Sequence, residues 1–101
     1  MSEEIKRELN NERAIIVCAE QFGLVGDPTR MKICWLLCKH KELSVGNIAE
    51  TLNVSASVVS HSLKRLNQNN MVEKRQVHKH VFYRLTNTDF TSIIKRSLKN
   101  V

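Results

Sequence analysis

Glycine and proline are so scarce in this chain that most of it has to be helical. The 101 residues include three glycines and one proline, the residues that most often interrupt helices. Apolar residues recur near helical spacing over 3–21, and Gly23 and Gly26 are expected to break this first helix. Asp27 and Pro28 then form a strong start for a second helix, because Asp caps free amides and proline fits the first turn. This second helix runs to about residue 39, and its apolar middle is typical of a buried core helix.

Two shorter amphipathic helices follow, separated by a tight turn. Ser44 is a good N-cap for a helix over about 45–52, and Ser55 or Ser57 caps a further helix over about 55–67. Asn53 lies between them, where a left-handed turn residue is required, and Asn tolerates that conformation. This arrangement predicts a helix-turn-helix unit over about 44–67, whose second helix can lie in the major groove of DNA.

The rest of the chain predicts a β-hairpin and one more helix. Residues 71–76 and 81–85 favour two strands with a polar tip between them, which makes 71–85 a wing. Apolar residues at helical spacing then predict an amphipathic helix over about 89–100. The predicted fold is mainly α with a small β-hairpin: a winged helix-turn-helix in the order helix, helix, helix-turn-helix, wing, helix. The length suits a single domain, here residues 1–101.

The positive charge of the chain is concentrated in the helix-turn-helix and the wing. The net charge is +6, and residues 55–85 carry six basic side chains against Glu73 alone. A localised basic patch is typical of a protein that binds a polyanion, here double-stranded DNA; the alternative is a solvated basic face. The candidate DNA contacts on the second short helix and the hairpin are Ser57, Ser60, His61, Lys64, Arg65, Lys74, Arg75, His78 and Lys79.

The first and last helices carry apolar stripes that exceed what a small monomer can cover, so a dimer core shared between two copies is expected. The hypothesised dimer seam combines positions from both helices, over about 3–21 and 89–100. Its residues are Ile5, Leu9, Ile16, Phe90, Ile93, Ile94, Leu98 and Val101.

Two motifs, in their order and spacing, resemble the ArsR/SmtB family of dimeric bacterial repressors. Residues 24–33 are similar to the family's Leu-Gly-Asp-Pro-Thr-Arg helix opening, and 59–66 to its Val-Ser-His-His-Leu recognition helix. The resemblance implies a homodimer that binds a palindromic operator and is released by an effector. Ser62 replaces the second His of the motif, and we expect it to tune sequence preference. Asn70 stands where the family often has glycine, and Val77-His78 stands where the wing tip usually carries glycine; we ascribe both departures to local turn chemistry.

The metal-binding motifs of known sensors in that family do not identify an effector for this chain. The place of their Cys-x-Cys metal motif reads Leu-Ser-Val-Gly-Asn at 43–47, and the positions matching the zinc ligands are Asn87, Asp89 and Asn100. One carboxylate with two amides is a poor zinc site, so we predict no metal site of these two kinds and no cofactor. Three interpretations of the cysteines stay open: core packing, a thiol switch, or soft-metal sensing with Cys34 and Cys38. The possible sensing thiols are Cys18, Cys34 and Cys38.

Other function classes find little support. The chain lacks a glycine-rich phosphate loop, a His-Glu-x-x-His motif and an apparent Ser-His-Asp set, so we do not expect an enzyme. No apolar run approaches the roughly 20 residues that span a membrane, and no signal peptide is visible, which makes the cytoplasm the expected location. The alternative to a DNA-binding regulator is a winged-helix protein-interaction module that does not bind DNA, since fold alone does not give function.

Overall fold

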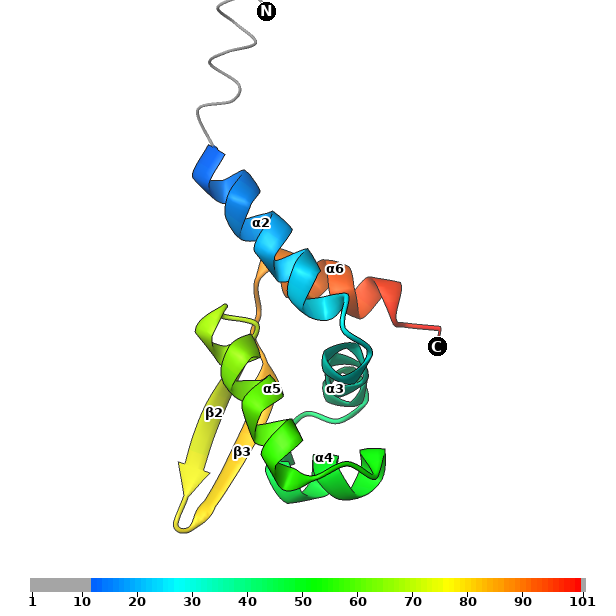
Figure 1. The fold of residues 1–101 in the computed structure, drawn as a ribbon, viewed down its shortest axis with the longest axis vertical. Helices are drawn as coiled ribbons and strands as arrows, with labels where there is room; N and C mark the ends of the chain where they lie inside the picture. Colours follow the sequence, from blue (N-terminus) through cyan, green and yellow to red (C-terminus); the bar gives the residue numbers. More distant parts are fainter. Residues whose placement is uncertain (1–11, 101) are drawn as a thin grey trace, which may run out of the picture.

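The computed structural model describes residues 12–100, and they fold as the predicted winged helix-turn-helix (Figure 1). The predicted seam residues Ile5, Leu9 and Val101 lie outside the described residues, as does the side chain of Cys18. The elements in chain order are α2 (Glu12–Val25), α3 (Pro28–Lys39), β1 (Leu43–Ser44), α4 (Val45–Leu52), α5 (Ala56–Gln68), β2 (Val72–Val77), β3 (His80–Leu85) and α6 (Asp89–Ser97).

The predicted start of α3 is confirmed, whereas the predicted end of the preceding helix is wrong. The Asp27 side chain accepts a hydrogen bond from the Arg30 amide at 3.0 Å, and Pro28 takes the first helical position. Helix α2 continues through Gly23 to Val25 instead of ending near residue 21. A single glycine costs a helix only about 1 kcal/mol relative to alanine, so tertiary packing overrides it. The chain leaves the helix at Gly26.

Side-chain caps define the helix-turn-helix as the sequence predicts. Ser44 forms a reciprocal capping box with Asn47, and Ser55 caps α5 by accepting from the Val58 amide at 3.2 Å. Asn53 adopts φ 54° and ψ 47°, the left-handed conformation that turns the chain from α4 into α5. These three caps set where the recognition helix begins.

The wing belongs to a three-stranded antiparallel sheet in the order β1-β3-β2. The sequence did not predict β1, which pairs Leu43 with Tyr83 and Ser44 with Phe82; a two-residue strand is too short to show a periodic pattern. Strands β2 and β3 pair from Val72↔Leu85 to Val77↔His80, so the hairpin tip is only two residues long.

Both positions where glycine was expected adopt the left-handed conformation. Asn70 has φ 58° just before β2, and His78 has φ 54° at the hairpin tip. Glycine adopts such angles without a steric penalty, while Asn and His are among the few other residues that tolerate them. Asn70 and His78 therefore form these two turns without glycine.

The hydrophobic core surrounds α3, which is seen end-on at the middle of the molecule in Figure 1, between α2, α6 and α4. Ile33, Cys34, Leu36 and Leu37 of this helix are buried, as expected for a central core helix. Helix α6 is capped by Thr88 but ends at Ser97, earlier than the predicted end near residue 100. Among the described residues, the helices are too short or too polar to cross a bilayer.

Candidate nucleic-acid interface

Helix α5 has one buried face and one polar, exposed face. Val59, Leu63 and Leu66 are fully buried and anchor the helix on the core. The candidate contacts on this helix are all exposed: Ser57, Ser60, His61, Lys64 and Arg65. Ser62 is only 5% exposed and packs with the buried face. Ser62 is therefore not exposed for direct contact with a base, and the expectation that it tunes sequence preference stays a prediction.

Arg65 lies at the far end of α5, away from the helix N-terminus. It lines a cavity of about 350 Å³ together with Glu20, Arg30 and Asn69, at the corner where α2 meets α3. The Arg30 guanidinium is held there by a 2.7 Å bond from its Nε to the Leu24 carbonyl oxygen. Arg65 is thus placed beside a second arginine, an arrangement that suits phosphate contact better than contact with a base edge.

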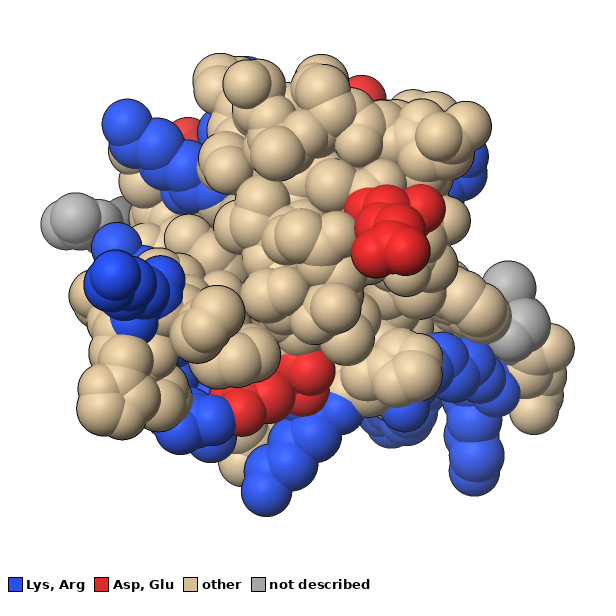
Figure 2. Space-filling view, turned by 90° about the horizontal axis from the view of Figure 1, so that it is seen from below, with Lys and Arg blue, Asp and Glu red and all other residues tan. Residues whose placement is uncertain are grey.

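The four candidate contacts on the wing are exposed: Lys74, Arg75, His78 and Lys79. Seen from below, Lys and Arg side chains lie around the edge of the molecule, and most of the central surface carries no charge (Figure 2). Among the described residues, neither Lys74 nor Lys79 forms an ion pair. Their ammonium groups are therefore available to a polyanion.

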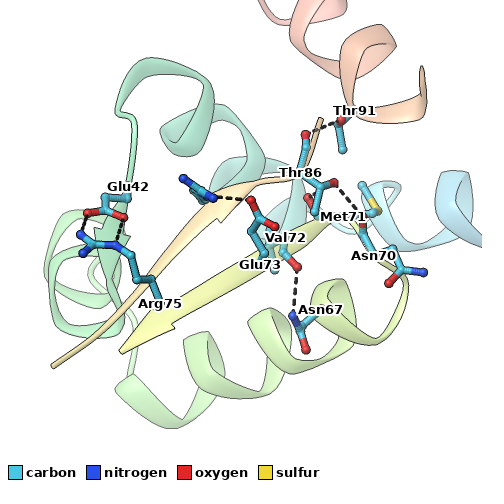
Figure 3. A network of polar contacts seen from close by, with 10 residues as sticks. Glu42, Asn67, Asn70, Met71, Val72, Glu73, Arg75, Thr86 and Thr91 are labelled. Atoms are coloured by element: carbon cyan, nitrogen blue, oxygen red, sulfur yellow. Dashed lines mark hydrogen bonds and ion pairs between the residues drawn. The ribbon is translucent and has the colours of Figure 1, made fainter. Parts of the chain in front are cut away.

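Arg75 has a protein partner instead. Its guanidinium forms two hydrogen bonds to the Glu42 carboxylate, one of them 3.2 Å from Nε to Oε2, and lies 5.8 Å from the centroid of the Phe82 ring (Figure 3). The hydrogen bonds from Arg75 lower the pKa of Glu42 and raise that of Arg75. Glu42 immediately precedes β1 and the helix-turn-helix. This pair therefore ties the wing to the base of the recognition unit.

A chain of polar contacts also fixes the wing to both of its neighbouring helices (Figure 3). The Asn67 amide of α5 donates to the Val72 carbonyl at 3.0 Å. The Thr86 hydroxyl donates to the Asn70 carbonyl at 2.7 Å, and the Thr91 hydroxyl of α6 donates to the Thr86 carbonyl at 2.6 Å. The end of α5, the base of the wing and the start of α6 are thus joined through short, directional bonds.

The predicted seam residues within the described part of the chain differ in their exposure to solvent. Phe90 and Ile94 lie in the core of this chain, at 7% and 4% exposed, and Leu98 is half-buried. Ile16 and Ile93 are 53% and 40% exposed, so they remain open to a second copy. The role of all five in a dimer stays a prediction.

Two further apolar residues of α2 were missing from the predicted seam. Val17 and Phe22 are 45% and 50% exposed. The Phe22 ring also packs edge-on against Phe90, with centroids 4.7 Å apart. Val17 and Phe22 follow Ile16 by one and six positions, which does not place the three residues on one face of α2, so the sequence pattern alone does not identify them.

The two cysteines of α3 differ in reactivity. Cys34 is fully buried, and burial raises the pKa of its thiol to about 12. Cys38 is half-buried; burial raises its pKa too, but the positive charges of Lys95 and Lys39 act in the opposite direction. Within residues 12–100, no three His, Cys, Asp or Glu side chains are grouped so that they could hold a metal ion.

Comparison with known proteins identifies relatives of this architecture. Residues 27–74 match the model of a family described as bacterial regulatory protein, arsR family. The transcriptional repressor SdpR of Bacillus subtilis is 36% identical over 67 residues, which are 66% of this chain and 73% of SdpR.

A second sequence relative and a solved structure are similar to a larger share of this chain than SdpR is. A transcriptional repressor SmtB homologue of Synechocystis is 32% identical over 77 residues, 76% of this chain but only 58% of that relative's own length. The structure of reduced HlyU from Vibrio cholerae superposes with a TM-score of 0.80 at 25% identity, covering 90% of this chain and 95% of HlyU. The likeness therefore extends well beyond the helix-turn-helix.

Proposed function

Because this chain belongs to the arsR family of bacterial regulatory proteins, we propose that it is a sequence-specific DNA-binding transcriptional repressor that acts as a homodimer. The observation that carries the proposal is the geometry of α5. Its apolar face is buried against the core, while its exposed face offers hydroxyl, imidazole and ammonium groups. Such groups hydrogen-bond base edges and phosphates. The two named relatives are both described as transcriptional repressors.

The residues divide between reading bases and binding phosphates. Ser57, Ser60 and His61 lie in the first half of α5, the part that meets base edges when such a helix enters the major groove. Lys64 and Arg65, nearer its end, meet phosphates. The wing supplies Lys74, His78 and Lys79, which contact the backbone or minor groove beside the recognition helix.

A homodimer places two recognition helices on one operator. The exposed apolar residues Ile16, Val17 and Phe22 of α2 and Ile93 of α6 support a seam that involves both helices, since burial of large apolar side chains against a partner is favourable. Two-fold symmetry of the dimer requires a palindromic operator, with half-sites about 34–36 Å apart or a multiple of that distance. Binding over a promoter would block transcription in the cytoplasm, where a bacterial regulator meets its DNA. An effector would release the dimer.

The test is fluorescence anisotropy with labelled duplex from the chain's own upstream region. Lys64→Ala should weaken binding and reduce the slope of log affinity against log salt by about 0.9, the value for one lost phosphate contact. His61→Ala should weaken binding several-fold to this duplex, with a smaller effect on unrelated DNA. Lys99→Ala removes an exposed lysine beyond the end of α6 and serves as the matched control, with unchanged affinity.

Two results would contradict the proposal. Absence of binding to any duplex at low salt would favour the protein-interaction module instead. Equal effects of Lys64→Ala and Lys99→Ala would mean that α5 is not the recognition helix. Light scattering tests the dimer separately: Phe22→Glu should yield monomers, and an unchanged dimer would reject this seam.

The buried thiol of Cys34 supports core packing over a sensing role for that residue. A thiol switch would require Cys38, the more accessible of the two thiols on α3. Mild oxidation in the same anisotropy assay separates these cases. Loss of binding that reductant restores would assign the cysteines a sensing role, and indifference would return them to the core.

A further inference from the structure

A polar cavity of about 460 Å³ lies between the end of α3, the wing strands and α6. Helix α3 and the residues after it contribute Cys38, His40 and Lys41 to its wall. The wing strands contribute Glu73 and Arg84. The C-terminal part of the chain contributes Asn87 and Lys95. The volume is in the range of pockets that hold small molecules, about 300–1,000 Å³.

The charge of this cavity is positive and only partly neutralised. Arg84 donates from its Nε to the Glu73 carboxylate at 2.7 Å, directly across the β2–β3 ladder (Figure 3). Among the described residues, Lys41 and Lys95 form no ion pair. The walls therefore present the ammonium groups of Lys41 and Lys95 without a carboxylate partner among the described residues. They also present the guanidinium of Arg84, which is paired with Glu73. His40 and Asn87 add polar groups that can donate hydrogen bonds to an oxyanion.

The cavity lies outside the proposed recognition helix and the proposed dimer seam. None of its lining residues belongs to α5. Lys95 follows Ile93 by two residues on α6, which places it about 200° around the helix at 100° per residue. Since Ile93 faces the proposed partner, Lys95 faces the opposite side. The mouth of the cavity is therefore not part of the seam formed by α2 and Ile93.

We propose that this cavity binds a small anion carrying carboxylate or phosphate groups. This anion is the effector of the regulator, a role that rests on the proposed function. An oxyanion between Lys41 and Lys95 reaches Arg84 and competes with Glu73 for its guanidinium. Glu73 and Arg84 are paired residues of β2 and β3. Occupation of the cavity therefore changes a contact within the wing, on the same sheet that Arg75 and Glu42 tie to the helix-turn-helix.

Binding is tested first without DNA. ¹⁵N-labelled protein is titrated with citrate and, separately, with inorganic phosphate, at an ionic strength held constant with chloride. Saturable amide shifts are expected around Lys41, Asn87 and Lys95 with at least one of the two anions, and the stronger one identifies carboxylate or phosphate as the preferred group. Lys95→Gln should raise the dissociation constant about fivefold or more, whereas Lys99→Gln, outside the cavity, should leave it within about twofold.

Lys41→Gln provides a second variant, on the segment that follows α3, and should weaken anion binding similarly. Non-saturable shifts with both anions, or equal effects of Lys95→Gln and Lys99→Gln, would overturn the site. The effector role is then tested by anisotropy at constant ionic strength. Saturation with the anion should weaken binding of the wild type to its duplex, and Lys95→Gln should be less sensitive. Anion binding that leaves DNA affinity unchanged would keep the site and overturn its role as effector, whereas failure of the proposed function appears as absence of DNA binding with no anion present.

Discussion

Replacing Thr91 with valine should destabilise the protein by about 2–3 kcal/mol, although the two side chains have nearly the same shape. Thr91 is fully buried. Its hydroxyl donates to the Thr86 carbonyl at 2.6 Å and accepts from the Thr88 amide at 2.9 Å. Valine removes both bonds without opening a cavity. A buried group left without its partner costs about 1–3 kcal/mol; the half-buried Thr88 amide is reached more easily by water and contributes the smaller part.

Urea denaturation followed by circular dichroism measures this change. Wild type and variant are compared at one protein concentration, because association makes apparent stability depend on concentration. Ser97→Ala is the control: its hydroxyl donates to the Ile93 carbonyl within the same helix at 2.9 Å and is exposed. Its effect should stay within about 0.5 kcal/mol, as for other exposed substitutions. A Thr91→Val variant within the same limit would refute the reasoning, because the contacts between α6 and the wing would then carry no net energy.

Three further outcomes follow from particular contacts. Arg75 lowers the pKa of Glu42, so this ion pair should stabilise the protein above the ordinary Glu pKa. The stabilisation should be lost as the pH falls through the lowered pKa. The urea midpoints of wild type and Glu42→Gln should therefore converge at acid pH, and a constant difference between them would contradict the pairing. His78→Gly should leave stability unchanged or raise it by up to about 1 kcal/mol, because glycine avoids the left-handed penalty but loses more chain entropy on folding. His78→Val should lower the melting temperature. Equal melting temperatures for the two variants would reject the strained turn. Iodoacetamide at pH 8 should alkylate Cys34 far more slowly than Cys38, because burial raises the pKa of Cys34 to about 12. Peptide mass spectrometry measures the alkylation rate of each cysteine. Equal rates would mean that the core opens readily.

The helix-turn-helix was predictable because its signals are local. Ser44, Ser55 and Asn53 cap or turn the chain through bonds to residues within a few positions, so their types alone predict α4 and α5. The start of α3 at Asp27 is of the same kind. Strand β1 was missed, because its pairing with Tyr83 lies about forty positions away along the chain and leaves no local pattern.

The exposure of the candidate DNA contacts on α5 was predictable because helical periodicity separates a buried face from a polar one. Their contact with DNA stays a prediction. The partners of individual charges were not predictable. Arg75 is held by Glu42 and Arg84 by Glu73, so two of the wing's cations already have carboxylates. The burial of Ser62 was also not predictable from the motif, because it depends on how α5 packs against the core.

The sequence by itself determined the order of the helices and the wing, the winged helix-turn-helix class and the concentration of positive charge on residues 55–85. Propensity, capping and charge are properties of neighbouring residues. Only the tertiary structure decided which cations stay unpaired, which seam residues remain exposed, and that Lys41, Arg84 and Lys95 line one cavity. Those facts depend on contacts between segments far apart in the chain, whose geometry is set by packing around α3 rather than by any local pattern.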